Sequence, residues 1–200
     1  GLEDIFIGGA KGQAGALFVQ QSDGQFVPTN EILFSKSKQS EDTDALFFDA
    51  DGDDDLDLYV ARGSNEFTGL NPALIDRLYI NDGQGNFRQS PQNLPIKSKT
   101  DASSCVSAAD FDQDGDLDLF VGVRLKAGVY GIPVSSYLLE NDGKGNFKNV
   151  SESKAPDSNQ IGMVTDAIWA DTNGDKDQDL VIVGDWMPIK ILENQNGSLT

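Results

Sequence analysis

The stretch FFDADGDDDLDLYV at residues 47–60 recurs as AADFDQDGDLDLFV at 108–121 and as WADTNGDKDQDLVI at 169–182. The last aspartates of the three acidic clusters, Asp57, Asp118 and Asp179, follow one another at intervals of 61 residues. Asp4 in GLEDIFIGG matches the same slot 53 residues before Asp57, so the chain is expected to begin inside a further copy. Self-similarity at a fixed period of this size indicates a repeat architecture.

A second marker follows each acidic cluster. RLYINDGQGNF at 77–87 and YLLENDGKGNF at 137–147 have weaker copies in LFVQQSDGQF at 17–26 and ILENQNGSL at 191–199. An apolar run followed by Asn, Asp and Gly predicts a β-hairpin, because Asn and Gly accept the positive φ of tight turns. Each repeat therefore reads as four strands: one enters the acidic loop, one leaves it, and the hairpin supplies two more.

Four short strands per unit at a near-constant period predict an all-β fold, a β-propeller of four-stranded blades. A β-solenoid is the alternative, but its coils are usually much shorter than about 60 residues. The expected units are a partial blade at 1–40, blades at 41–99 and 100–160, and a partial blade at 161–200. Because propellers need about 4 to 8 blades to close, we expect this single propeller segment to be an arc of a larger ring, with closure of four blades as the other option.

The composition excludes several kinds of chemistry. The 200 residues carry 33 acidic against 15 basic side chains, a net charge of −18, which argues against a nucleic-acid partner. With no histidine, the chain holds no Ser-His-Asp or Cys-His pair and no imidazole-ligated metal. The single cysteine, Cys105, forms no internal disulfide. No apolar run is long enough to span a bilayer, so no transmembrane segment is expected.

The three acidic loops predict a metal site each. Oxygen side chains recur at loop positions 1, 3, 5 and 9, and the backbone carbonyl of position 7 can join them. Such all-oxygen cages suit Ca²⁺, whereas Mg²⁺ gives up its waters reluctantly. The predicted ligands are Asp49, Asp51, Asp53, Asp55 and Asp57, then Asp110, Asp112, Asp114, Asp116 and Asp118, then Asp171, Asn173, Asp175, Asp177 and Asp179.

Two other interpretations of these loops are weaker. An EF-hand requires Glu at loop position 12 and flanking helices, but that position holds Val60, Val121 and Ile182. The acids could instead form a merely solvated face. However, the loops contain six, five and four acids, together 15 of the 33, and such crowding is repulsive without a cation. About three Ca²⁺ ions are therefore expected, mainly in a structural role, with direct bridging to a ligand as the alternative.

The DxDxDGDxDL loops followed by NDGxGNF resemble the FG-GAP/VCBS repeats of integrin α-subunit propellers and of many bacterial surface proteins. The order of SNEF, DRLYINDGQGNF, SSCVSAADFDQDGDLDLFVG, SYLLENDGKGNF, GMVTDAIWAD and VGDWMPIKILEN is similar to bacterial proteins of the cartilage-acidic-protein type, which carry VCBS repeats before an ASPIC/UnbV domain. The resemblance covers essentially the whole chain. It implies a calcium-binding propeller on secreted or cell-surface proteins, with adhesion or binding roles and no known catalytic residues. Asp54 and Lys176 depart from the usual Gly at loop position 6, and Asn173 departs from the usual Asp at position 3.

Three functions are consistent with the sequence. The first is a calcium-stabilised module that binds a protein or a glycan and is not an enzyme. It would lie outside the cell or on its surface, with outer-membrane anchoring or a periplasmic location as bacterial variants. The second is part of a polysaccharide hydrolase or lyase, since two carboxylates suffice for glycoside hydrolysis. The third is a scaffold whose active part lies outside this chain.

The long connections at 61–76 and 124–136 are the expected ligand surface, because connections longer than a turn needs often carry function. Trp186 in GDWMP is expected to pack between blades rather than to serve as a sugar platform. The connections and their edges contribute aromatic and basic candidates for an anionic or acidic-sugar ligand: Arg62, Phe67, Arg77, Arg124, Lys126 and Tyr130.

Overall fold

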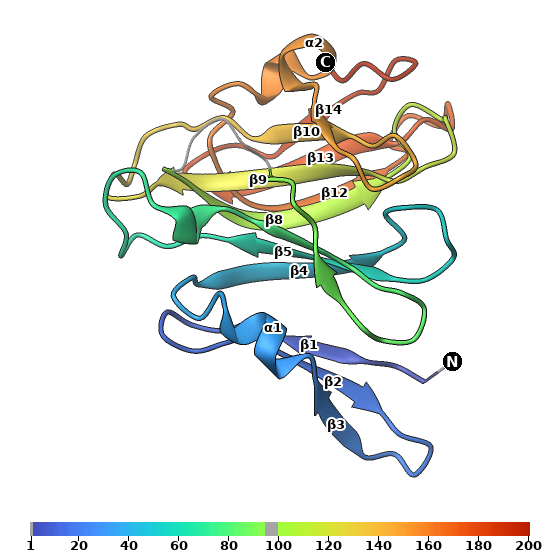
Figure 1. Cartoon of the computed structure of the whole chain (residues 1–200). Helices are drawn as coiled ribbons and strands as arrows, with labels where there is room; N and C mark the ends of the chain where they lie inside the picture. Colours follow the sequence, from blue (N-terminus) through green and yellow to red (C-terminus); the bar gives the residue numbers. More distant parts are fainter. Residues whose placement is uncertain (1, 95–99) are drawn as a thin grey trace.

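The computed structural model describes residues 2–94 and 100–200, which form four antiparallel sheets of three or four strands (Figure 1). The first two sheets contain β1 (Ile5–Ile7), β2 (Ala16–Gln20) and β3 (Phe26–Thr29), then β4 (Asp42–Phe48), β5 (Asp57–Arg62), β6 (Arg77–Ile80) and β7 (Arg88–Gln89). The third and fourth contain β8 (Asp101–Ala109), β9 (Asp118–Lys126), β10 (Tyr137–Glu140) and β11 (Lys148–Asn149), then β12 (Met163–Ala170), β13 (Asp179–Asp185) and β14 (Lys190–Leu192).

Helical structure is confined to short connections in the described part of the chain. It comprises α1 (Glu31–Ser35), α2 (Ser151–Lys154) and two 3-10 turns at Pro72–Leu74 and Pro156–Ser158. None of these helices has the length and apolar character required to cross a lipid bilayer.

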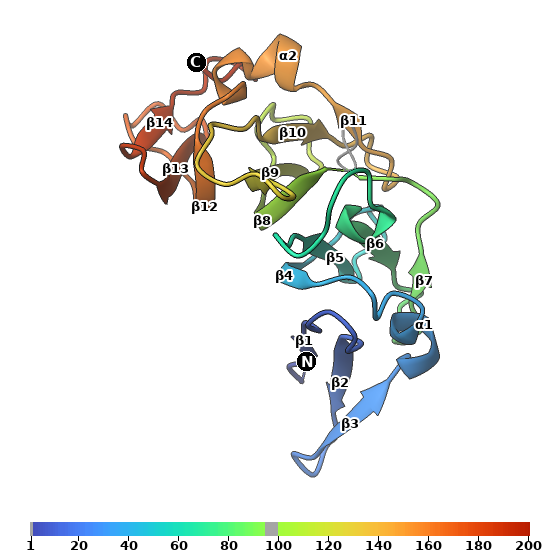
Figure 2. The same cartoon turned by 90° about the vertical axis from the view of Figure 1, so that its left-hand side faces the viewer.

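Each sheet is a meander in which neighbouring strands in sequence pair antiparallel, in the order β4-β5-β6-β7 and its equivalents. The four sheets follow one another around an open arc, from the first to the last along the chain (Figure 2). This arrangement confirms the predicted all-β propeller architecture. The hairpins predicted from the Asn-Asp-Gly motifs join β6 to β7 and β10 to β11.

The division at residues 40, 99 and 160 stays a prediction. The strands β4 to β7 and β8 to β11 lie on either side of residue 99, which is outside the described residues.

The core lies between the sheets, and the second strand of each inner blade is buried on both faces. All six residues of β5 are buried, because alternate side chains point to opposite neighbours. Leu58 and Val60 pack toward the first sheet with Leu17, whereas Tyr59 packs toward the third sheet with Leu119. A near-continuous apolar run is what such a doubly covered strand requires.

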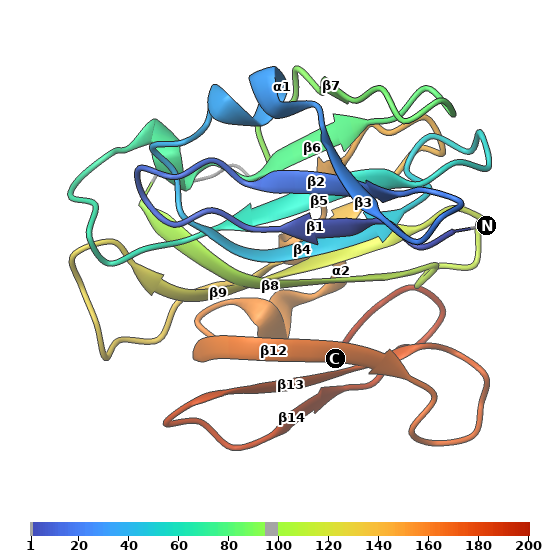
Figure 3. The ribbon, with the colours of Figure 1, turned by 90° about the horizontal axis from the view of Figure 1, so that it is seen from below.

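The turns at the two ends of the strands differ in kind. The acidic loops lie at one end of the sheets, and the connections 61–76 and 124–136 lie at the other (Figures 1 and 3). On β9, Asp118 at the first end and Arg124 near the second are six residues apart, or about 20 Å along an extended strand. The fold therefore separates two candidate functional surfaces.

Candidate metal centre

Each acidic loop joins the first strand of a sheet to the second. The loops follow β4, β8 and β12 and precede β5, β9 and β13. The first loop turns through positive φ at Gly52 (77°) and Asp54 (67°). Glycine adopts this conformation freely, and Asp adopts it more readily than most side chains.

The aspartate at loop position 1 organises the turn through backbone N–H groups. Asp49 accepts hydrogen bonds from the Gly52 and Asp54 N–H groups at 2.8 and 3.0 Å. Asp171 accepts from the same two loop positions, through the Gly174 and Lys176 N–H groups, whereas Asp110 accepts from the Asp114 and Gly115 N–H groups at positions 5 and 6. In all three loops the first aspartate thus accepts two backbone N–H groups, one of them from position 6.

The aspartate at position 9 is a fully buried hub. Asp57, Asp118 and Asp179 each have 0% exposure. The two oxygens of Asp57 accept the Ala50 N–H of its own loop at 3.0 Å and the Asn81 N–H of the following hairpin at 2.7 Å. Asp118 and Asp179 make the corresponding contacts, to Phe111 and Asn141 and to Thr172 and Asn194. The hub ties loop to hairpin in all three repeats.

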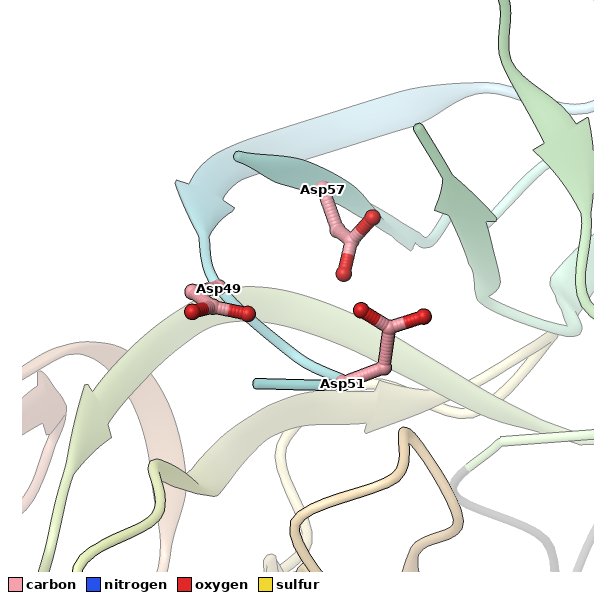
Figure 4. A group of neighbouring side chains, drawn as sticks. All are labelled: Asp49, Asp51 and Asp57. Atoms are coloured by element: carbon pink, nitrogen blue, oxygen red, sulfur yellow. The ribbon is translucent and has the colours of Figure 1, made fainter. Parts of the chain in front are cut away.

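Positions 1, 3 and 9 converge in the first two loops. One carboxylate oxygen from each of Asp49, Asp51 and Asp57 lies within 4.8 Å of the other two, and Figure 4 shows these carboxylates grouped around one space. A second group of the same geometry consists of Asp110, Asp112 and Asp118. Both groups could hold a metal ion.

Several carboxylate oxygens in these two loops are buried without a hydrogen-bond partner among the described residues. They are Oδ1 of Asp51 and Asp55 in the first loop, and Oδ1 of Asp112 and Asp116 in the second. An unpaired buried carboxylate oxygen is unfavourable, since it has lost water and gained nothing in exchange. Hard oxygen donors left in this state match the coordination preference of Ca²⁺, so the residues fit the ion.

Burial disfavours the charged state of several aspartates in the first two loops. Burial, followed by repulsion from Asp53 and Asp49, raises the pKa of Asp51. Burial raises the pKa of Asp57 to about 6 and that of Asp118 to about 7, although backbone hydrogen bonds oppose the shift in both. A cation among these groups would stabilise the ionised forms.

The third loop differs in its donors. Asn173 occupies the slot of Asp51 and Asp112, so fewer carboxylates converge there, and its Nδ2 donates to Asp175 at 2.9 Å. Burial raises the pKa of Asp179, but hydrogen bonds from the Thr172 hydroxyl and from the Asn194 and Thr172 N–H groups together lower it below its usual value. The third loop therefore satisfies more of its own oxygens.

The remaining predicted ligands have distinct environments. At position 5, Asp53, Asp114 and Asp175 each accept the N–H of the residue two positions later. At position 7, the side chain of Asp177 accepts from Gln113 Nε2 at 2.6 Å, whereas Asp55 and Asp116 have the unpaired oxygens noted above. Positions 5 and 7 lie outside the two groups of converging carboxylates found among the described residues.

The next blade covers each of the first two loops, which sequence reasoning missed. Asn141 Nδ2 donates to the Ala50 carbonyl at 2.9 Å, and Asn194 Nδ2 donates to the Phe111 carbonyl at 2.7 Å. The recurring Asn of the hairpin motif is the signal that could have revealed this, because its side chain bridges blades besides favouring the turn. Lys154 adds a cation to the second loop, with Nζ 2.9 Å from Asp112 Oδ2.

A family model described as an FG-GAP-like repeat matches residues 1–60 and 61–121. The chain belongs to the FG-GAP-like repeat family. The first matched repeat ends within β5 and the second within β9. Each family repeat therefore ends with the first strand, the acidic loop and the beginning of the second strand of the following sheet. A search of curated proteins found no match to this chain.

The connection 61–76 offers less to a ligand than expected. Arg62 is 2% exposed and donates from Nε to Asp42 at 3.1 Å and from Nη2 to Tyr79 Oη at 3.2 Å. Phe67 is buried, and Arg77 donates to the carbonyls of Ile75 and Asp76. These side chains serve the fold, because the end of β5 lies inside the blade stack.

The connection 124–136 is different. Tyr130 is 47% exposed and Lys126 is exposed, while Arg124 is ion-paired with Asp185 at 2.8 Å. The expectation that Trp186 packs between blades is wrong, since its side chain is 80% exposed. Aromatic surface is thus available on this side of the sheets.

Proposed function

We propose that this chain is a calcium-stabilised, non-enzymatic extracellular module that presents loops for binding a protein or a glycan. FG-GAP-like repeats are typical of extracellular and cell-surface proteins, which supports this setting. Calcium sites of extracellular modules have dissociation constants of about 10⁻⁴ to 10⁻³ M, in keeping with the calcium available outside cells.

The four buried and unpaired carboxylate oxygens in the first two loops are the observation that carries the calcium proposal. A bound Ca²⁺ would supply positive charge and oxygen coordination at each loop. Asp49, Asp51 and Asp57 would hold it in the first loop, and Asp110, Asp112 and Asp118 in the second. The third loop would bind more weakly, because Asn173 contributes a neutral oxygen.

The proposed role of calcium is structural. The position 9 aspartates connect each loop to its hairpin, and the hairpin of the following blade covers the loop. Neutralising the loop would therefore stabilise contacts within a blade and between blades. Because metal binds only the folded arrangement, its binding free energy adds to folding.

A polysaccharide hydrolase or lyase is the second candidate. Glycoside hydrolysis uses two carboxylates. Two pockets adjoin the connection 124–136: the described lining of one has the carboxylate of Glu41, and that of the other has those of Asp101 and Glu152. The Asp101 carboxylate already accepts the Tyr137 hydroxyl. A scaffold role, with the active part outside this chain, is a further alternative.

A closer kinship with bacterial proteins of the cartilage-acidic-protein type, which carry an ASPIC/UnbV domain, is proposed from the order of sequence segments. Under this proposal the protein is secreted or displayed at the bacterial surface, with outer-membrane anchoring or a periplasmic location as variants. No nucleic-acid partner is proposed, given the net charge of −18.

The test combines calorimetric unfolding with calcium titration. Chelated protein is unfolded with no metal, with millimolar Ca²⁺ and with millimolar Mg²⁺. We expect Ca²⁺ to raise the melting temperature markedly, Mg²⁺ to have little effect, and titration to find two tighter sites and one weaker site. Melting that does not respond to Ca²⁺ would contradict the proposal.

A further inference from the structure

Trp186, which directly follows β13, has an unusual combination of exposure and backbone conformation. Its side chain is 80% exposed, and its φ is 56°. A bulky residue with positive φ is an outlier and persists only where its surroundings hold it in place. Backbone strain of this kind clusters at active sites and ligand-binding sites.

Tyr130, in the connection between β9 and β10, packs against the indole. The two rings meet edge to face, with centroids 5.5 Å apart and an interplanar angle of 75°. Gly131, with φ 87°, lies so close that a Cβ there would be 3.3 Å from Trp186 Cζ3. Glycine therefore permits this packing, and the two rings form an aromatic corner between the third and fourth sheets.

Asp185 holds the Tyr130 side chain of this corner in place. Its Oδ2 accepts from Arg124 Nε at 2.8 Å and from Tyr130 Oη at 3.2 Å, and Arg124 Nη2 lies 2.8 Å away. The ion pair joins β9 to β13 and balances the charge of the guanidinium. The idea that Arg124 is free to hold an acidic ligand therefore loses its support.

A pocket of about 480 Å³ adjoins the corner, and Tyr130 and Arg124 form one of its walls. This volume is within the range of about 300 to 1,000 Å³ usual for small-ligand sites. Asn65 and Glu41 also line it, and neither the Asn65 Nδ2 nor the Glu41 carboxylate has a hydrogen-bond partner among the residues that the structure describes. An amide donor and a carboxylate acceptor are suited to sugar hydroxyl groups.

We infer that the aromatic corner of Tyr130 and Trp186, together with this adjoining pocket, binds a neutral glycan. The aromatic faces offer stacking surface to a pyranose ring, and the Asn65 amide and the Glu41 carboxylate bond its hydroxyl groups. With Arg124 balanced by Asp185, the charge left in the pocket is that of Glu41, which disfavours acidic sugars. This inference rests on the proposed binding function and names its ligand class and its site.

The experiment uses the full chain in millimolar Ca²⁺. Native gels are cast with neutral polysaccharides (xyloglucan, galactomannan, β-glucan) or with acidic polygalacturonate. We expect retardation by at least one neutral polysaccharide and none by polygalacturonate. Oligosaccharides of the retarding polymer should then change the fluorescence of the Trp169→Phe variant, in which Trp186 is the remaining tryptophan.

Two variants on the same turn complete the design. Trp186→Ala should weaken glycan binding at least about tenfold, whereas Ile189→Ala, which removes another exposed apolar side chain nearby, should leave it unchanged. Absence of retardation by every neutral polysaccharide, stronger retardation by polygalacturonate, or equal effects of the two substitutions would overturn the inference.

The calcium-induced rise in melting temperature distinguishes this inference from the proposed function. The metal loops lie at the opposite end of the strands, so Trp186→Ala should retain that rise. Wild-type protein that responds to calcium but binds no glycan would refute the glycan site alone. Wild-type protein without the calcium response would refute the proposed function itself.

Discussion

Replacing Asp51 with Asn should stabilise the metal-free protein and weaken its response to calcium. In the first loop, one oxygen of Asp51 lies within 4.8 Å of an oxygen of Asp49 and of Asp57. Two unit charges at 4.8 Å repel by about 0.9 kcal/mol in bulk water and about 3.5 kcal/mol at an effective dielectric constant of 20. Asp51 is half-buried and partly screened. Removing its two repulsions should therefore raise the free energy of unfolding of the metal-free protein by about 2 to 3 kcal/mol.

The assay is thermal unfolding at pH 7.5 in a chelator. For a chain of this size, 1 kcal/mol shifts the melting temperature by about 2 to 4 °C, so Asp51→Asn should melt about 5 to 10 °C above wild type. In 10 mM Ca²⁺, a site with a dissociation constant of about 10⁻⁴ M contributes about 2.7 kcal/mol. Asp51→Asn loses a charged ligand and with it most of this calcium-binding contribution. In Ca²⁺ its melting temperature should therefore no longer exceed that of wild type.

Asp54→Asn is the matched control. Asp54 lies three positions further along the loop, is exposed, and has a φ of 67° that Asn also accepts. It changes the net charge equally but is not a proposed ligand, so its calcium response should equal that of wild type. The reasoning is refuted if Asp51→Asn does not gain stability in chelator, or if both variants keep the full calcium response.

Three further predictions concern the second loop, a buried carboxyl and a contact between blades. Asp112→Asn should not stabilise the metal-free protein as Asp51→Asn does, because it also loses the ion pair with Lys154. Lys154→Met should lower the metal-free melting temperature and enlarge the calcium-induced rise. Calorimetry with and without chelator checks both variants. Burial raises the pKa of Asp76 to about 7, so its contribution to stability is full below pH 4 and is lost as the pH rises through 7. In saturating Ca²⁺, the difference in unfolding free energy between wild type and Asp76→Asn should therefore shrink from pH 5 to pH 8, and a constant difference would contradict the assignment. Asn141→Ala removes hydrogen bonds to the Ala50 and Leu117 carbonyls and should lower the free energy of unfolding, measured in urea, by about 2 to 3 kcal/mol. A loss below about 0.5 kcal/mol would show that this contact between blades does not stabilise the protein.

The strands and loops of this protein are encoded locally, which is why the sequence predicts them. The apolar runs of β5 and β9, the Asn-Asp-Gly turns and the spacing of the aspartates are short-range patterns whose physical meaning does not depend on distant residues. Asp57 and Asp118 can be assigned to metal loops from the sequence, because position 9 of a loop follows from counting.

The predictions about individual side chains beyond the loops were less successful. Arg62 and Phe67 resemble loop residues in sequence, yet both are buried, and Trp186 resembles a core residue but is exposed. The burial of a side chain depends on which neighbour covers it, and a single strand does not encode that neighbour.

Repeat architecture, the acidic loops and the hairpins were determined by the sequence alone, because backbone turns and strand periodicity depend on residues a few positions apart. The tertiary structure decided which groups meet across blades: Asn141 with Ala50, 91 residues apart, Lys154 with Asp112, and Tyr130 with Trp186. Those contacts follow from the stacking of one sheet on the next, which brings together residues that local pattern cannot relate.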